Sequence, residues 1–309
     1  MKVYHGIQEF VKLENAVVTS GTFDGVHLGH QKILQRLTEV AALTGGETVV
    51  ITFYPHPRSV IAQDPQEVKL LSTLEEKIEL LTQNGIQHLL VIPFTREFSE
   101  LTSEDFIQQV LLNTIGTKTL VIGYDHRFGR HREGSFEYLK ANSQRYGFAV
   151  EEISRQDIDH VAVSSSKIRK ALQEGDMLPA AHFLGRNYDI SGLIVKGKQL
   201  GRTIGFPTAN IQVREQTKLI PQDGVYAVKV QYKDQYLNGM LNIGNRPTVD
   251  GTYKTIEVNI FDFDKDIYGE NLKVEFIQRV RAEKKFSGLD ELKAQIASDK
   301  LQIKQILEQ

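Results

Sequence analysis

Short apolar runs alternate with helical patterns through the first half of the chain. Runs typical of strands lie near residues 16–19, 48–53, 88–92, 118–122 and 148–153. After the first run, Ile33, Leu34 and Leu37 recur at the spacing of an amphipathic helix. This alternation predicts an α/β domain in which helices cover both faces of a parallel sheet. In such a sheet, ligands bind in the loops that follow the carboxyl ends of the strands.

Several helices of this half carry end signals. The first pattern stops at Gly45 and Gly46. A capping box, Ser72 to Glu75, precedes a second helix that ends at residues 84–85. A third helix is expected to start near Ser103. Its predicted core positions are Phe106, Ile107, Val110 and Leu111.

The pattern changes near residue 185, after a helical segment at 177–183. From there to residue 289, short strands and turn residues follow one another without helices. Closure of these strands into a small antiparallel β-barrel would leave no exposed edge. We therefore expect two domains, 1–184 and 185–309. The expected strands of the second domain are 188–195, 225–232, 236–241, 254–261 and 271–277, with a tight hairpin at 233–234.

An amphipathic C-terminal helix is expected over residues 289–307. Leu292, Ile296 and Ile303 lie near one face of this helix, which should pack on the barrel. Leu301 falls off that face. A break near residues 298–299 is therefore an alternative to one continuous helix.

The composition is that of a globular protein of about two domains. The chain has 309 residues, of which 40% are hydrophobic and 25% charged. The absence of cysteine excludes disulfides, thiolate metal sites and a cysteine nucleophile. With a net charge of −2 and no long block of like charge, we expect no nucleic-acid partner. No apolar run could cross a bilayer and no signal peptide is recognised, so we expect a cytoplasmic protein. The sequence leaves the oligomeric state open.

Candidate chemistry is densest at residues 21–30, GTFDGVHLGH, between the first strand and the first helix. Glycines let the backbone approach a ligand closely, and a helix N-terminus attracts anions. His27 and His30 could donate hydrogen bonds to a phosphate whose charge grows in a transition state. On these residues alone, a glycine-rich turn with two surface histidines is the alternative.

Three later loops also carry polar groups. In residues 54–58, YPHPR, a rigid turn is as good an interpretation as a site. Residues 123–134 crowd three arginines and two histidines between glycines, which favours anion binding over a solvated basic loop. Residues 164–169, SSSKIR, begin a helix with serines and two cations, so phosphate binding and plain helix capping both fit.

The second half has a glycine-rich segment, 197–205, followed by the sequence PTAN at 207–210. In an extended segment, Thr208 and Asn210 would place two neutral oxygen ligands on one side. Such ligands, together with nucleotide phosphates, suit Mg²⁺. The overlapping residues 192–199 nearly match a Walker A loop, but a glutamine replaces the Ser/Thr and the apolar run favours a strand. We therefore reject a P-loop.

Glu257 alternates with apolar neighbours in an expected strand. It would share a strand face with Thr255 and Asn259, whereas Ile256 and Val258 face the other way. On the residues alone, a charged surface side chain is the simpler interpretation.

These motifs, in this order, resemble those of bacterial bifunctional riboflavin kinase/FAD synthetases. Residues 21–30 are similar to the GxFDGVHxGH signature of the FMN adenylyltransferase module. Residues 123–134 and 164–169 are similar to its GxDFxFG and SSTxIR segments, with His126 where phenylalanine is usual. The PTAN segment is similar to the motif of the riboflavin kinase domain.

The resemblance implies two ATP-dependent reactions with Mg²⁺: phosphorylation of riboflavin to FMN in the barrel, and adenylylation of FMN to FAD in a Rossmann-like nucleotidyltransferase domain. Glu257 would be the general base of the kinase, and Thr208 and Asn210 its magnesium ligands. His27 and His30 would stabilise the transition state at the α-phosphate of ATP. Further residues implied to bind nucleotide or flavin are Gly21, Phe23, Asp24, Gly25, Gly29, Asp125, Arg127, Ser164, Arg169, Gly197, Gly201, Gly205, Asn242 and Arg281.

Two other functions are alternatives to this one. The first is a nucleotidyltransferase that acts on another phosphate ester and carries an accessory barrel. Thr208, Asn210 and Glu257 argue against it, because an accessory barrel has no need for that set. The second is a non-catalytic flavin- or RNA-binding regulator, which the complete set of catalytic residue types and the lack of a broad basic face disfavour.

Overall fold

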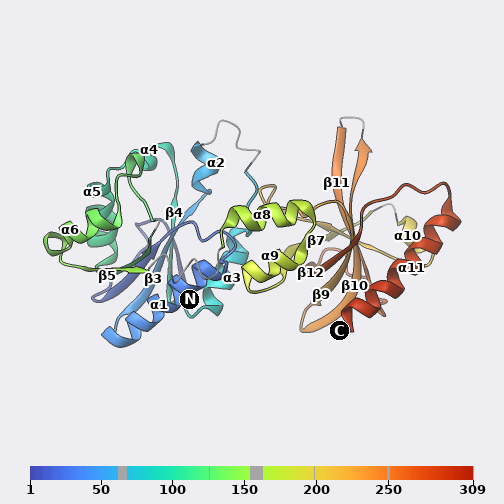
Figure 1. Cartoon of the computed structure of the whole chain (residues 1–309), viewed down its shortest axis with the longest axis horizontal. Helices are drawn as coiled ribbons and strands as arrows, with labels where there is room; N and C mark the ends of the chain where they lie inside the picture. The colour runs from blue at the N-terminus through green and yellow to red at the C-terminus, as the bar shows by residue number, and fades with distance from the viewer. Residues whose placement is uncertain (62–67, 125, 154–162, 198, 249–250, 309) are drawn as a thin grey trace. The chain divides into compact units, whose positions relative to one another are not determined.

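The chain forms two compact units, Met1–Ser165 and Ser166–Gln309, in the computed structural model of Figure 1. The structure describes residues 1–61, 68–124, 126–153, 163–197, 199–248 and 251–308. The first unit contains a six-stranded parallel sheet and the second a closed six-stranded barrel. The predicted fold class of both halves is confirmed.

The sheet of the first unit has the strand order β1-β4-β3-β2-β5-β6, and all its strand pairs are parallel. Its strands are β1 (Lys2–His5), β2 (Ala16–Ser20), β3 (Glu47–Tyr54), β4 (His88–Pro93), β5 (Thr117–Gly123) and β6 (Ala149–Ile153). Only β1, a short edge strand, was not predicted. The central strand β2 leads directly into the segment 21–30.

Helices cover both faces of this sheet, as the apolar pattern predicts (Figure 1). Leu34, Leu37 and Leu81 belong to the core on one face, and Val110 and Leu139 to the core on the other. The first face is covered by α1 (Leu28–Thr44) and α3 (Leu74–Gln83), and the second by α5 (Ser103–Phe106), the π-helical segment η2 (Ile107–Ile115) and α6 (Phe136–Tyr146). Three shorter helices lie in loops: α2 (Pro57–Ile61), α4 (Arg96–Ser99) and η3 (Arg130–Arg132).

The capping box of α3 lies one residue later than predicted. Thr73 accepts a hydrogen bond from the Glu76 amide, and the Glu76 carboxylate accepts one from the Thr73 amide. Both Ser72 and Thr73 satisfy the motif in sequence, so the pattern could not separate them. Ser72 is instead used to hold the loop that follows β2, as described below.

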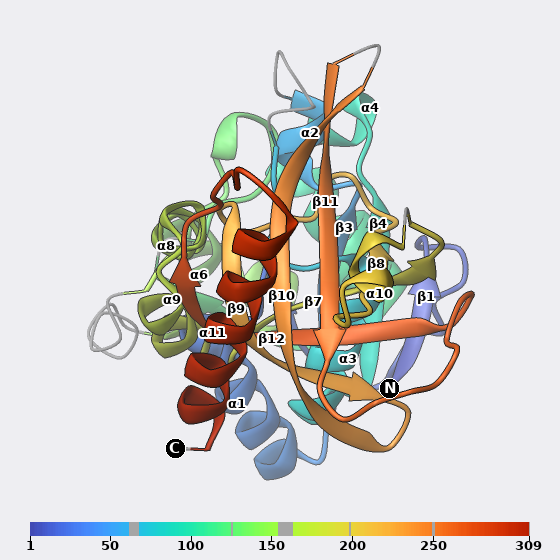
Figure 2. The ribbon, with the colours of Figure 1, turned by 90° about the vertical axis from the view of Figure 1, so that its right-hand side faces the viewer.

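The barrel of the second unit has the strand order β10-β11-β8-β7-β12-β9 (Figure 2). Its strands are β7 (Tyr188–Val195), β8 (Ala209–Gln212), β9 (Gly224–Tyr232), β10 (Gln235–Thr248), β11 (Gly251–Ile260) and β12 (Asn271–Arg281). A one-turn helix, α10 (Leu200–Thr203), precedes β8. Strand β8 was not predicted from the sequence, because an alternation over only four residues, ANIQ, is too short to stand out. This strand nevertheless closes the barrel between β7 and β11.

Helices α8 (Ser165–Glu174) and α9 (Met177–Leu184) precede the barrel. Helix α9 packs on β7 and β12, and the Leu172 carbonyl of α8 accepts a hydrogen bond from the Gln222 amide at 3.0 Å. The two compact units therefore divide near residue 165. The functional boundary expected at residue 185 stays a prediction.

Helix α11 (Leu289–Leu307) packs on the outside of the barrel through Ile303, which contacts a cluster with Val225 and Met240 (Figure 2). The break near residues 298–299 is wrong, because the helix is continuous. Asp299 is 2% exposed, and its carboxylate accepts hydrogen bonds from both Nε and Nη2 of Arg281 at 2.8–3.1 Å. Asp299 interrupts the apolar pattern of the helix because it is buried in an ion pair with Arg281 of β12. Leu301 lies off the packed face, as predicted.

Candidate active sites

The segment 21–30 forms a loop that ends at the N-terminus of α1. His27 is the N-cap residue, and its Nδ1 accepts a hydrogen bond from the His30 amide at 3.3 Å. The two imidazole rings are stacked, with 3.7 Å between their centroids and 12° between their planes. The predicted pair of histidines is thus brought together at the predicted helix N-terminus.

The backbone of this loop is strained. Phe23 and Val26 have φ angles of 46° and 39°, a region that residues with a Cβ rarely adopt. Both side chains are buried, so packing holds the backbone there. Each such residue costs about 1–3 kcal/mol, and such strain is concentrated at functional sites. Gly21 allows the loop to pass the Phe23 ring, which a Cβ at Gly21 would meet at 3.2 Å.

Asp24 ties the loop to the chain that precedes α3. Its buried carboxylate accepts hydrogen bonds from the amides of Leu71 and Ser72 at 2.9 and 3.2 Å. The Ser72 hydroxyl in turn accepts one from the Gly25 amide at 3.0 Å. These contacts fix the loop to the segment before α3. A role of Asp24 in ligand binding stays a prediction.

The sequence analysis missed Lys77, a buried lysine of α3. Its side chain is on the same face as Leu81, four residues later, and its ammonium donates a hydrogen bond to the Thr52 hydroxyl at 3.3 Å. Burial lowers the pKa of His30 well below its ordinary value, and the neighbouring His27 and Lys77 lower it further. His30 is therefore neutral at pH 7. The only signal in the sequence was a cation at a core-facing helical position.

The basic loop after β5 is held against the end of β2, next to the first loop. The Ser20 hydroxyl and His126 Nε2 lie 2.8 Å apart, and the His126 ring packs on Phe128. The imidazole thus fills the position where phenylalanine was expected and adds a polar link. Arg127 is exposed. Asp125, a predicted ligand-binding residue, lies outside the described residues.

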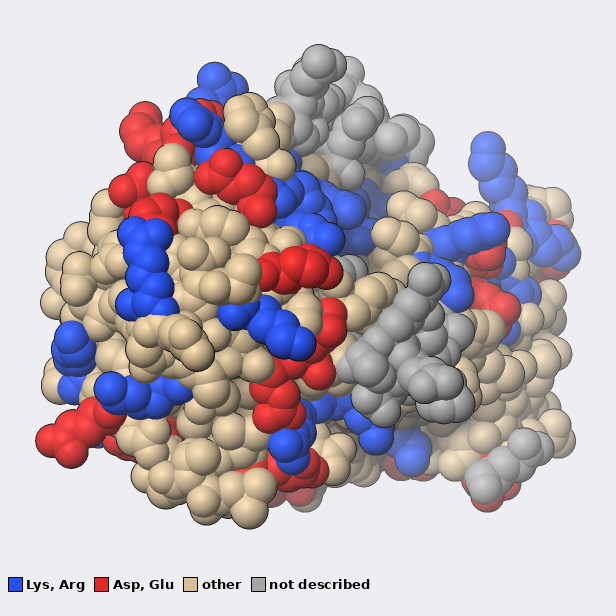
Figure 3. All heavy atoms as spheres, turned by 60° about the vertical axis from the view of Figure 1, so that its left-hand side comes forward, with Lys and Arg blue, Asp and Glu red and all other residues tan. Residues whose placement is uncertain are grey.

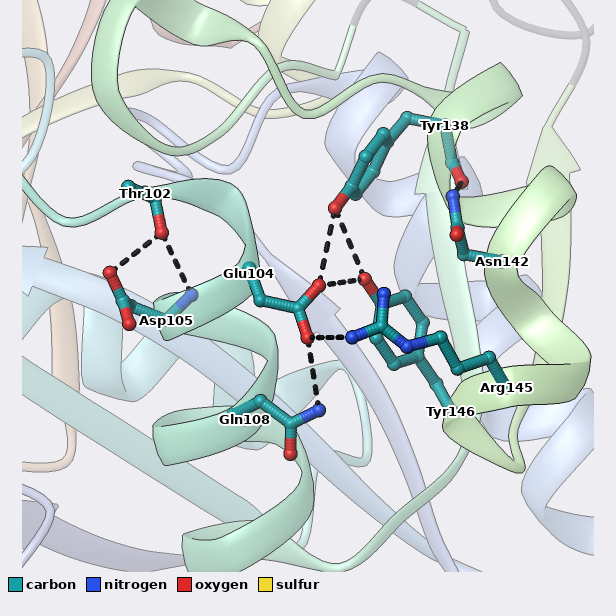
Figure 4. Close-up of polar contacts among 8 residues, drawn as sticks. All are labelled: Thr102, Glu104, Asp105, Gln108, Tyr138, Asn142, Arg145 and Tyr146. Carbon is teal, nitrogen blue, oxygen red and sulfur yellow. Dashed lines mark hydrogen bonds and ion pairs between the residues drawn. The ribbon is translucent and has the colours of Figure 1, made fainter.

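A polar cluster around Glu104 fixes the helices that flank this basic loop (Figure 4). The Glu104 carboxylate accepts hydrogen bonds from Tyr146 Oη at 2.5 Å and from Arg145 at 3.0 Å, both on α6. Burial and the Glu104 carboxylate raise the pKa of Tyr146, whereas the Tyr146 hydroxyl lowers the pKa of Glu104. Ser103, the residue directly before Glu104, donates its amide hydrogen to the Glu133 carboxylate in the basic loop at 3.0 Å. The cluster therefore supports the loop without reaching into it.

The two remaining loops are described in part. His56 is buried and accepts a hydrogen bond from the Arg58 amide at 3.1 Å, which fits the rigid-turn interpretation. Ser164 is exposed, and Ser165 donates to the Asp24 carbonyl at 3.3 Å. Arg169 is half-buried on α8.

The polar residues of the second unit gather on the outer face of the barrel. Met240 packs towards α11 on that face, and residues two positions apart on a strand share a face. Asn242 of β10 therefore lies on the outer face, and it pairs in register with Glu257 of β11. The alternate residues Leu241 and Val258 are fully buried. The predicted arrangement of the strand around Glu257 is confirmed.

Glu257 is held by groups from two other segments. Its Oε2 accepts a hydrogen bond from the Thr208 hydroxyl at 3.3 Å, and its Oε1 forms an ion pair with Arg246. On its other side, Asn210 of β8 is its partner in the strand register. Arg246 was not among the predicted site residues, because an isolated arginine in a strand has no distinctive pattern.

The PTAN segment is fixed in place by Asn259. The Asn259 carboxamide donates a hydrogen bond to the Pro207 carbonyl at 2.6 Å. Gly197 lies against the Asn210 side chain and Gly201 against the Phe206 carbonyl, so a Cβ at either glycine would overlap these groups. Gly205 has a φ of 86°, which favours glycine. The glycines thus allow the loop to fold closely over Thr208 and Asn210.

Arg281 contacts residues outside the cluster around Glu257. Its guanidinium binds Asp299 and thereby attaches α11 to β12. Its predicted role in binding nucleotide or flavin is untested and stays a prediction.

Oxygen-bearing side chains are the candidates for holding a metal. Within the described ranges, no three His, Cys, Asp or Glu side chains are grouped to bind one. The Thr208 hydroxyl contacts Glu257, and Asn210 is the register partner of Glu257, so both oxygen-bearing residues belong to the segment next to this carboxylate. Such a donor set suits Mg²⁺ held mainly by nucleotide phosphates. No described helix is long and apolar enough to cross a membrane. On the face drawn in Figure 3, Lys and Arg are interspersed with Asp and Glu.

Two family models cover the two halves of the chain. The model described as FAD synthetase matches residues 10–167, and the model described as riboflavin kinase matches residues 184–307. The fold and the two family models thus define a protein with a nucleotidyltransferase-type sheet and a kinase-type barrel.

Close relatives extend over almost the whole chain. Three proteins named bifunctional riboflavin kinase/FMN adenylyltransferase are similar to it. The Haemophilus influenzae protein is 41% identical over 288 residues, 93% of this chain and 92% of the relative. The Escherichia coli protein is 40% identical over 304 residues, which cover 97% of this chain and 96% of the relative. The Bacillus subtilis protein is 37% identical over 302 residues, which cover 96% of this chain and 93% of the relative. The chain belongs to the bifunctional riboflavin kinase/FMN adenylyltransferase family.

The overall architecture also matches a solved structure. A crystal structure named as a macrolide-efflux protein from Streptococcus pneumoniae has a TM-score of 0.86 and 30% identity, covering 96% of this chain and 97% of that one. The match of the barrel to riboflavin kinase removes the reason to regard it as an accessory domain.

Lys77→Met removes one charge near His30 and nearly preserves the side-chain length. Because a nearby cation disfavours the imidazolium form, we expect the pKa of His30 to rise in this variant. An NMR titration of the histidine rings measures the shift. Lys140→Met, on the opposite face of the sheet, is the control. Equal pKa values of His30 in the two variants would contradict the contribution of Lys77.

Proposed function

We propose that two separate clusters of side chains carry out the two reactions named for this family, one cluster in each compact unit. In the barrel, the γ-phosphoryl group of ATP is transferred to the 5′-hydroxyl of riboflavin, which gives FMN and ADP. In the α/β unit, a phosphate oxygen of FMN attacks the α-phosphorus of a second ATP, which gives FAD and pyrophosphate. Both reactions are displacements at phosphorus, so positioning and charge neutralisation supply most of the catalysis.

Glu257 is the general base of the kinase reaction in this proposal. The observation that carries the assignment is the position of its carboxylate, in register with Asn210 on one side and Asn242 on the other, beside the PTAN segment. A base must lie within about 3 Å of the proton that it accepts. The riboflavin 5′-hydroxyl would therefore be bound on the outer face of the barrel, next to this carboxylate.

The proposal assigns Thr208 and Asn210 to Mg²⁺ bound with ATP. The metal would neutralise part of the phosphate charge and orient the γ-phosphoryl group. Gly197, Gly201 and Gly205 allow the loop of residues 197–205 to approach the phosphates closely. Asn259 supports this arrangement because it holds the carbonyl group directly before Thr208.

His27 and His30 act in the adenylyl transfer. Because His27 Nδ1 accepts the His30 amide hydrogen, its ring carries the proton on Nε2 when neutral. A neutral imidazole can still donate this hydrogen bond to an α-phosphate oxygen, and Lys77 supplies a fixed positive charge nearby. The N-terminus of α1 adds its own attraction for the phosphate.

Several assignments rest on the motif resemblance alone. These are the binding roles of Phe23, Gly29, Asp125, Arg127, Ser164 and Arg169. The same holds for Asn242 and Arg281 in the barrel. The domain boundary at residues 184–185 rests on the change of sequence pattern there, and a cytoplasmic location stays an expectation from the sequence.

Glu257→Gln should abolish most of the kinase activity and preserve the adenylyltransferase. Loss of a general base lowers the rate by about 10²–10⁴-fold, whereas glutamine keeps the size of the side chain. The rates of FMN formation from riboflavin and of FAD formation from supplied FMN are measured separately. Equal loss of both activities would show that the two reactions do not use separate sites.

His27→Asn should have the opposite effect. Asparagine is a good N-cap residue, so α1 keeps its cap, but the imidazole is lost. We expect FAD formation from FMN to fall by about 10²-fold, the usual scale for one lost transition-state donor, while riboflavin phosphorylation is unchanged. Normal FAD formation by this variant would remove His27 from the mechanism.

A further inference from the structure

Arg246 is the cation in contact with the proposed base of the kinase. Its guanidinium forms an ion pair with Glu257 Oε1, while Thr208 donates to Oε2 of the same carboxylate. Arg246 lies four residues after Asn242 on β10 and therefore shares its outer face of the barrel. Both side chains of the ion pair are partly buried, at 31% and 18% exposed.

The other ion pairs described in the barrel and α11 lie on different carboxylates. They are Lys233–Glu270, Lys254–Asp223, Lys273–Asp189, Arg281–Asp299 and Lys284–Glu291. Within this part of the described chain, Arg246 is thus the cation that contacts the carboxylate of Glu257. The planar guanidinium group of an arginine at this position can donate paired hydrogen bonds to the oxygens of a phosphoryl group as well as to a carboxylate.

The expected reaction geometry brings that phosphoryl group to Arg246. The attacking hydroxyl lies about 3 Å from the base, and the reacting oxygen and phosphorus are about 3–3.5 Å apart before the reaction. The transferred phosphorus is therefore within about 6.5 Å of the Glu257 carboxylate. A guanidinium that touches the carboxylate needs only a small side-chain movement to reach the phosphoryl oxygens.

We propose that Arg246 is a catalytic residue of the kinase, which holds Glu257 before ATP and riboflavin bind and donates hydrogen bonds to the phosphoryl group during its transfer. This inference rests on the proposed role of Glu257. In the step, the 5′-hydroxyl proton goes to Glu257 and a bond forms between the hydroxyl oxygen and the γ-phosphorus. The bond from this phosphorus to the bridging oxygen breaks, and its electron pair leaves with ADP. Arg246 stays protonated throughout.

The test is steady-state kinetics of riboflavin phosphorylation by the full-length Arg246→Ala protein, with and without added guanidinium ion. We expect kcat to fall by about 10³-fold, as for arginines that stabilise a transferred phosphoryl group, with KM for riboflavin nearly unchanged. Added guanidinium should then raise kcat at least about tenfold, because it restores the missing group. FAD formation from supplied FMN should remain normal because it uses the other unit, and the nearly unchanged KM for riboflavin shows that the barrel is folded.

A kcat near the wild-type value, a loss confined to KM for riboflavin, or a lack of response to guanidinium would each overturn the proposal. The control is Lys254→Met, which removes a neighbouring cation of β11 that is paired with Asp223. This variant should keep normal kcat. Glu257→Gln, assayed in parallel, separates the two hypotheses: if it retains activity, the base assignment fails, whereas its loss together with an active Arg246→Ala protein rejects only the role of Arg246.

Discussion

The pairing register of β11 with β8 and β10 is the constraint on which the proposed kinase site depends. It sets Glu257 opposite Asn210 and Asn242, and a slip by one residue would turn the carboxylate towards the barrel interior. Closed pairing around the barrel and burial of the alternate residues, such as Val258, prevent this slip. The proposed base therefore lies on a rigid strand and the proposed phosphate loop is rich in glycine, a division that combines precise positioning with close approach to a ligand.

In the α/β unit, the two histidines are positioned by a different kind of contact. They lie on a loop and a helix end, so the loop must be held by contacts outside itself. Asp24 binds the chain before α3, and His126 connects the neighbouring basic loop to Ser20. Lys77 then brings a positive charge close to His30, which favours a neutral His30 imidazole and an anionic ligand. Both units therefore hold the groups proposed for phosphate chemistry in place through contacts within the protein itself.

Sequence patterns predicted the parts of this structure that follow from periodicity. The sheet, the barrel and the C-terminal helix were all recognisable, and only the short strands β1 and β8 were missed. The residues of the two histidine and PTAN motifs were also recognisable, because glycines and polar ligands stand close together in the chain. Lys77, Asn259 and Arg246 were not, since each acts through contacts with distant segments. The apparent break in α11 has the same origin, because Asp299 is explained only by Arg281 of β12.

The claim of two independent sites in one chain is tested most directly by complementation. The variants Glu257→Gln and His27→Asn, each supplied with riboflavin, ATP and Mg²⁺, are compared with an equal mixture of both, and FAD is measured by chromatography. The account predicts that FAD is formed rapidly by the mixture and hardly at all by either variant alone, because one protein makes FMN and the other uses it. A mixture no more active than its separate components would contradict the account.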